Sequence, residues 1–241
     1  EGNTTLVVTG GQQGIDLTTK VLCNPGDTVI CEEPSFIGAL NCFRTYGTKL
    51  RGIPMEDDGL NVEALETALK EEKNAKILYL IPTFQNPAGT TLPLERRQAI
   101  YEIAKRYGLL IVEDNPYGEL RFRGERVPTF KSMDTEGLVI YCSSFSKILA
   151  PGLRLGYLIL HETLWSKVLV AKQCSDVHTP MLTQMMALRF MQRYDMDAMI
   201  EIMRQTYQHK CQVMLDAMEE CFPDWVTWVV PEGGLFIWCD L

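Results

Sequence analysis

The sequence predicts an α/β fold in which a mostly parallel central sheet lies between two layers of helices. Short apolar runs alternate along the chain with stretches whose apolar residues recur at helical spacing. Most of these runs are continuously apolar, as in strands that helices cover on both faces. A polar cluster follows several of the runs, and an open α/β sheet binds its ligands beyond the carboxyl ends of its strands.

Six apolar runs are the expected strands. They occupy residues 6–9, 28–31, 76–81, 109–112, 137–142 and 155–160. Between the third run and the fourth, residues 95–107 carry apolar side chains at helical spacing, and Gly108 is expected to end that helix. Further along the chain, Thr179 is expected to be the N-cap of another helix and Pro180 its first residue.

The last part of the chain predicts a long helix followed by a hairpin. From Ile200 onward an apolar stripe indicates core packing along one helix face. Its members are Met203, Tyr207, Cys211, Met214 and Met218. The runs 225–230 and 235–241 are typical of two strands that flank a turn at 231–234.

Composition favours a cytoplasmic enzyme with a sizeable core. The 241 residues are 46% hydrophobic and 22% charged. A net charge of -8 and a pI near 5.0 argue against nucleic-acid binding by this segment. The eight cysteines form no CxxC pair and the three histidines lack zinc-ligand spacing, so we expect reduced thiols and no metal site. The sequence contains neither a signal peptide nor an apolar stretch of transmembrane length, so no membrane contact is expected.

The first candidate site is centred on Lys147, which follows an apolar run. Ser144 and Ser146 precede it, and Arg154 stands seven positions beyond it. A lysine amine can condense with an aldehyde, while hydroxyls and a guanidinium suit a phosphate. Pyridoxal 5'-phosphate (PLP) needs both an aldehyde partner and a phosphate site. For this motif alone, a surface lysine after a buried strand is the alternative interpretation.

Three further polar clusters follow the first, third and fourth apolar runs. They contain, in chain order, Gly10-Gly11-Gln12, then Asn86, then Asp114 with Tyr117. Taken singly, the glycine pair and the Asn-Pro step could be ordinary turns, and the aspartate could be a helix cap. Because the carboxyl ends of parallel strands share one edge of a sheet, the four clusters can converge on one site.

With these motifs in this order, the chain resembles the fold-type I PLP enzymes of aminotransferase class I/II. The resemblance covers nearly all 241 residues. It is strongest to the branch of the 2-aminoadipate/kynurenine and aromatic aminotransferases, which includes the aminotransferase-like domains of MocR-type regulators. It implies a three-layer α/β/α large domain, PLP as cofactor, and transfer of an amino group from an amino acid to a 2-oxo acid by a ping-pong mechanism.

The resemblance also implies which residues bind the PLP phosphate. Gly11 and Gln12 would donate their backbone amides at the start of a helix, where anions are favoured. Ser144, Ser146 and Arg154 would complete the phosphate site.

The remaining roles concern the cofactor ring and the chemistry. Phe36 would stack on the pyridine ring, with ordinary core packing as the alternative. Asn86 and Tyr117 would donate hydrogen bonds to the phenolic oxygen. Asp114 would pair with the protonated ring nitrogen, a role for which the neighbouring Glu113 could compete.

Lys147 would have two tasks in such an enzyme. It would hold PLP as a Schiff base, and after displacement by an amino acid it would move a proton between Cα and C4' of the cofactor. In this scheme Asp114 and Tyr117 are the other two residues that take part in catalysis.

The domain organisation is expected to be incomplete. Residues 1–194 would form the large PLP-binding domain, truncated at its N-terminus. Residues 195–241 would form a long connecting helix and the beginning of a smaller C-terminal α+β domain. The family's arginine for the substrate carboxylate would lie beyond Leu241, so the choice of amino acid and 2-oxo acid is not predicted.

The resemblance further implies a homodimer with active sites at the subunit interface. Met181, Met185 and Met186 lie on one expected helix, where they suit either an interface or the core. Two other functions stay open. One is the effector domain of a MocR-type transcription regulator, with a DNA-binding domain before Glu1, and the other is a PLP-dependent β-lyase on the same fold.

Overall fold

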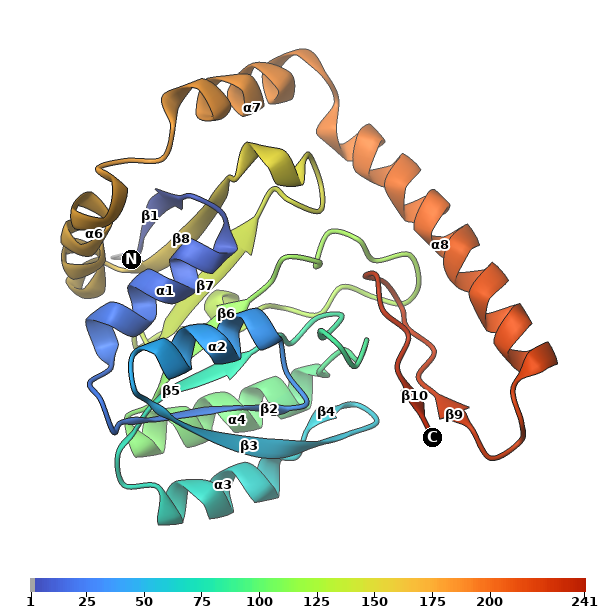
Figure 1. Cartoon of the computed structure of the whole chain (residues 1–241), viewed down its shortest axis with the longest axis horizontal. Helices are drawn as coiled ribbons and strands as arrows, with labels where there is room; N and C mark the ends of the chain where they lie inside the picture. The colour runs from blue at the N-terminus through green and yellow to red at the C-terminus, as the bar shows by residue number, and fades with distance from the viewer. Residues whose placement is uncertain (1–2) are drawn as a thin grey trace.

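The chain folds around one eight-stranded sheet with helices on both faces (Figure 1). The computed structural model describes residues 3–241. From edge to edge the strands are β1 (Asn3–Val8), β8 (Gly156–His161), β7 (Val139–Ser144), β6 (Leu110–Asp114), β5 (Ala75–Leu80), β2 (Thr28–Glu33), β3 (Lys49–Glu56) and β4 (Gly59–Leu60). The strands from β7 to β3 are parallel to one another, while β8 and β4 run antiparallel to their neighbours. The predicted mostly parallel α/β architecture is confirmed.

Each of the six predicted runs overlaps a strand, but β3 was not expected. Its residues are exposed or only partly buried, and Ile53 is the one buried residue of the strand. β3 lies near the edge of the sheet, where only the two-residue β4 follows it, so it lacks the continuous apolar run of the central strands.

The two faces of the sheet carry separate apolar cores. In β5, Ile77 and Tyr79 belong to one core, and Leu78 and Leu80 belong to the other, as expected when successive side chains alternate. The first core is covered by α1 (Gly11–Leu22), α2 (Ile37–Thr45) and α6 (Glu162–Asp176). The second is covered by α3 (Val62–Glu71), α4 (Leu94–Tyr107) and α5 (Phe130–Met133).

Of two predicted helix boundaries, the structure confirms one and shifts the other by one residue. α4 ends at Gly108, which has φ 64° and adopts the left-handed conformation expected of such a glycine. The next predicted boundary is one residue off, because Pro180 is the N-cap and the helix begins at Met181. Thr179 does not cap this helix, since its hydroxyl is hydrogen-bonded to the Thr9 hydroxyl at 3.1 Å.

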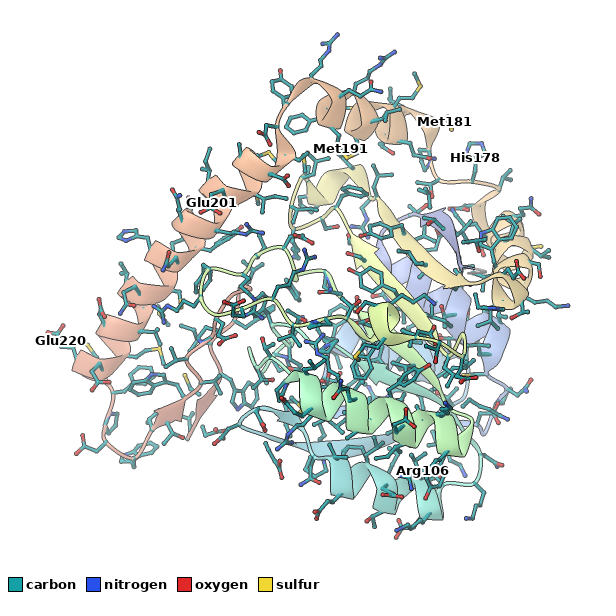
Figure 2. The ribbon with its side chains drawn as sticks, turned by 180° about the vertical axis from the view of Figure 1, so that it is seen from behind. Arg106, His178, Met181, Met191, Glu201 and Glu220 are labelled. Carbon is teal, nitrogen blue, oxygen red and sulfur yellow. The ribbon has the colours of Figure 1, made fainter. Side chains whose placement is uncertain are left out.

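The last helices lie along the periphery of the molecule (Figure 1). They are α7 (Met181–Arg193) and α8 (Met196–Cys221), and Figure 2 shows them from behind. The predicted stripe on α8 is only partly buried: Met218 is covered, whereas Met214 is 52% exposed beside a cavity between α8 and the following hairpin. Among residues 3–241, no helix combines the length and apolar character needed to cross a membrane.

The expected hairpin is present but pairs over a short length. β9 (Thr227–Trp228) and β10 (Cys239–Asp240) are antiparallel. The turn between them packs on the loop after β6, where Gly234 N donates to Leu120 O at 3.1 Å. The hairpin therefore returns to the carboxyl edge of the large sheet. The division of the chain near residue 194 stays a prediction.

Candidate active site

A cavity of about 380 Å³ lies at the sheet edge where β1, β5, β6 and β7 end. All the predicted site residues line it: Gly11, Gln12, Phe36, Asn86, Asp114, Tyr117, Ser144, Ser146, Lys147 and Arg154. The lining is completed by Ile15, Ile81, Pro116, Pro151 and Phe236. The structure thus brings the four polar clusters together, and the role of each residue stays a prediction.

One part of the cavity is suited to an anion. α1 begins at Gly11 after Gly10, whose φ of 80° is a conformation that favours glycine. A Cβ at Gly10 would collide with the guanidinium of Arg154, so this side chain lies against the start of the helix. The free N–H groups of a helix start and a nearby guanidinium both attract negative charge.

The two serines of this region differ in position. Ser144 is buried and donates a hydrogen bond to Ser146 Oγ at 2.8 Å. The Ser144 hydroxyl also accepts a bond from Ser146 N at 3.1 Å, which fixes the turn after β7. Ser146 Oγ lies 3.5 Å from Arg154 Nη1. Ser146 is therefore the hydroxyl that stands beside the arginine, and Ser144 supports it.

Asp114 provides a buried carboxylate at the end of β6. Its side chain is 6% exposed and faces the cavity, and Tyr79 donates a hydrogen bond to Asp114 Oδ2 at 2.6 Å. Burial raises the pKa of Asp114 to about 6, and the bond from Tyr79 partly offsets that rise. A cationic ligand group beside this carboxylate would be strongly favoured.

Glu113 points away from the cavity, so the structure places only Asp114 there. The Glu113 carboxylate accepts hydrogen bonds from Phe130 N at 3.0 Å and Lys131 N at 2.9 Å. It lies 3.9 Å from the buried guanidinium of Arg97. Successive side chains of a strand face opposite sides, which explains the separation of the two acids.

Asn86 and Tyr117 approach one another within the cavity. Asn86 Nδ2 lies 3.4 Å from the Tyr117 hydroxyl, and both can donate to one ligand oxygen. Burial and the nearby Asp114 raise the pKa of Tyr117 to about 12, so its hydroxyl keeps its proton. The aromatic lining includes Phe36, at the N-cap of α2, and Phe236, whose ring meets Tyr117 edge-on at 5.5 Å.

Lys147 lies in the turn that joins β7 to the next strand. Phe145 N donates to Leu155 O at 3.0 Å, and Leu149 N donates to Phe145 O at 2.8 Å. These bonds close the turn around the lysine, which is half-buried and lines the cavity. An amine, an anion site, a buried carboxylate and two donors to a further oxygen are the groups that PLP requires, so the residues present fit this cofactor.

Known proteins similar to this chain include aminotransferases, which agrees with a site suited to PLP. The family model for aminotransferase class I and II matches residues 1–241. The chain belongs to this family. It is 43% identical over 240 residues to aromatic-amino-acid aminotransferase 1 of Thermococcus litoralis, covering 98% of this chain and 58% of that protein.

Solved structures of the family have the same fold. The crystal structure of Pyrococcus horikoshii kynurenine aminotransferase, in complex with PMP, superimposes with a TM-score of 0.97 at 41% identity, covering 100% of this chain and 61% of that one. An uncharacterized HTH-type transcriptional regulator of Bacillus subtilis is 30% identical over 233 residues, covering 97% of this chain and 48% of that protein. The chain thus spans about three fifths of the length of the aminotransferases that it matches.

Several residues that shape this class I and II site were not predicted. Tyr79 lies within an apolar run whose pattern indicates core packing, although its hydroxyl contacts Asp114. Gln85 precedes Asn86 and is 1% exposed, with hydrogen bonds to Glu32 and Pro34 at the end of β2. Phe236 comes from the hairpin, far along the chain from the other lining residues. Of these three residues, only Gln85 could have been suspected from the sequence, because it directly precedes the predicted site residue Asn86.

A second cavity, of about 460 Å³, lies between the loop after β6 and α8. Two of its arginines contact the same glutamate: Arg126 contacts the Glu119 carboxylate at 2.8 Å, and Arg204 donates to the Glu119 carbonyl at 2.7 Å. Among the described residues that line it, there is no lysine and no buried carboxylate. The cavity that contains Lys147 is therefore the candidate active site.

Proposed function

We propose that the complete protein carrying this chain is a PLP-dependent aminotransferase. The observation that supports this most strongly is the cavity in which Lys147, the anion site at the start of α1 and the buried Asp114 meet. Membership of the aminotransferase class I and II family agrees with it. The proteins that this chain resembles also include an HTH-type transcriptional regulator. A regulatory protein that contains this domain is therefore the second candidate function.

Each residue has a task that follows from its position. The amides of Gly11 and Gln12, with Ser146 and Arg154, would hold the phosphate. PLP, when bound, supplies an aldehyde that takes up the amino group and a ring that withdraws electrons from the substrate Cα.

The other residues would act on the ring and on protons. Asp114 would stay ionised beside the ring nitrogen and keep it protonated. Asn86 and Tyr117 would donate to the phenolic oxygen, and Phe36 would cover a face of the ring. Lys147 would anchor the cofactor and then accept the Cα proton on its amine, because it lines the same cavity.

The substrates we propose are an amino acid and a 2-oxo acid. Relatives are named for aromatic amino acids, 2-aminoadipate and kynurenine, so these are the donors to test first. In the complete protein, product formation should require the 2-oxo acid, and initial rates should give the parallel double-reciprocal lines of a ping-pong reaction. Release of pyruvate and ammonia from cysteine conjugates without a 2-oxo acid would indicate a β-lyase. Specific DNA binding without turnover would indicate a regulator.

We also propose a cytoplasmic homodimer. The apolar side chains on α7 support an interface, since Met181, Met185 and Met186 are each more than half exposed (Figure 2 labels Met181). All eight cysteines within residues 3–241 are free thiols, which is consistent with a reducing compartment. Light scattering of the complete protein should give twice the chain mass. A monomer that still transaminates would contradict the dimer.

A further inference from the structure

Tyr79 is a buried residue of β5 whose hydroxyl reaches the candidate site from within the sheet. Its side chain is 0% exposed, and its ring packs edge-on against Phe43 with centroids 5.4 Å apart. Among residues 3–241, the only hydrogen bond of its hydroxyl goes to Asp114 Oδ2, at 2.6 Å. A phenylalanine would keep the ring packing, so packing alone does not account for the hydroxyl.

The bond occupies one of the two carboxylate oxygens of Asp114. Oδ2 is occupied by the Tyr79 hydroxyl, while the side chain also lines the cavity. A carboxylate fixed through one oxygen presents the other in a defined direction, which is what a geometrically demanding ligand contact needs.

We propose that Tyr79 is a positioning residue that orients Asp114 toward the nitrogen of a protonated heteroaromatic ring and keeps its carboxylate ionised, a role that rests on the proposed function.

The hydrogen bond from Tyr79 matters for the charge of Asp114, because no cationic group is among the neighbours named below. The neighbouring titratable groups are Glu32 from β2, Tyr79 from β5 and Cys142 from β7, none of which is cationic. Tyr117, from the loop after β6, is a further neutral neighbour. Burial favours the neutral acid, and the bond from Tyr79 favours the ionised form. Without that donor, a proton shared between the ring nitrogen and Asp114 would move toward the carboxylate.

The test uses the complete protein loaded with PLP that carries ¹⁵N at the ring nitrogen. The ¹⁵N chemical shift reports where that proton lies, independently of turnover. Tyr79→Phe should move the resonance toward the value of a neutral pyridine. Tyr101→Phe is the matched control, because Tyr101 is also buried and contacts an acid, Asp134, at 3.0 Å, but in the other core. It should leave the resonance unchanged.

A second variant guards against failure of the first to fold. Replacing Tyr79 with 3-fluorotyrosine keeps the ring and makes the hydroxyl a stronger donor, so the resonance should move toward the protonated value. Unchanged resonances in both Tyr79 variants would overturn the positioning role while leaving the proposed function intact. A wild-type protein that does not bind PLP would instead overturn the proposed function, and this role with it.

Discussion

Gln85 Nε2 donates a hydrogen bond to Glu32 Oε2 at 3.2 Å, and this contact joins β2 to the loop that carries Asn86. Both side chains are almost fully buried, and Ile81 N donates to the same glutamate oxygen at 3.0 Å. Gln85 also donates to Pro34 O at 2.9 Å. The loop on one side of the cavity and the segment that leads to Phe36 are therefore fixed by one glutamine.

Glu32 predicts a pH dependence of stability. Burial raises its pKa from 4.5 to about 7. Since the folded state binds this proton more tightly than the unfolded state, the contribution of Glu32 to stability is full below the unfolded pKa and is lost as the pH rises through the folded pKa. Glu32→Gln retains one acceptor oxygen for both donors and cannot ionise. Relative to wild type, the variant should gain up to roughly 3 kcal/mol of stability between about pH 5 and about pH 8.

Denaturant unfolding at several pH values measures this difference. Glu33→Gln is the control, because Glu33 is the exposed neighbour on the same strand. Equal pH profiles for Glu32→Gln and wild type would show that Glu32 keeps the same protonation state on folding.

Replacing Gly10 with alanine is expected to weaken anion binding at the start of α1. Alanine at this position would be strained at φ 80° and would also displace the Arg154 guanidinium. Gly26→Ala is a matched control, because Gly26 has φ 90° and an added Cβ there would meet no atom within 4 Å. We expect Gly10→Ala to weaken PLP binding by about tenfold or more, which corresponds to about 1.4 kcal/mol. Fluorescence titration of the complete protein measures both variants, and equal Kd values would argue against a phosphate beside Arg154.

Lys147 is expected to carry the cofactor covalently. Borohydride reduction of the PLP-loaded complete protein should place the label on the peptide that contains Lys147. Lys131 and Lys172 are internal controls, because their amines already contact Asp134 at 2.9 Å and Asp176 at 2.5 Å. Lys147→Ala should lose the label and turnover while still binding PLP. Mass spectrometry that located the label on either control lysine would refute the assignment.

Most of the sheet and the polar clusters are predictable from sequence for one physical reason. Strands covered on both faces, such as β5 and β6, contain an apolar run, and the polar residues at the end of that run mark the carboxyl edge of the sheet. Asp114 and Asn86 are found in this way. The half-exposed β3 is missed because its pattern lacks that continuity.

The residues that contact the site residues from within the sheet cannot be predicted in the same way. Tyr79 belongs to an apolar strand, and only the parallel pairing of β5 with β6 brings its hydroxyl to Asp114. The choice between Glu113 and Asp114 likewise depends on which face of β6 borders the cavity. Pairing partners and facing are properties of the folded sheet, so the local sequence leaves them open.

Arg97 and its neighbour Arg96 form a matched pair for a stability prediction. Arg97 is 0% exposed and donates to three backbone carbonyls, those of Leu92 at 2.8 Å, Pro82 at 2.8 Å and Pro128 at 3.1 Å. It also balances the buried Glu113 at 3.9 Å, so Arg97→Met leaves an unpaired acid and leaves the carbonyls of Leu92 and Pro128 without a donor.

We expect Arg97→Met to lower the free energy of unfolding by about 3–5 kcal/mol, the range for breaking a buried ion pair. Arg96 instead contacts Glu56 and Asp58 at the surface, where its side chain is 25% exposed. Solvent screens these contacts, so Arg96→Met should cost less than about 1 kcal/mol. Denaturant unfolding compares the two variants. Similar losses would mean that Arg97 does not stabilise the loop between β5 and α4 through its buried carbonyl contacts.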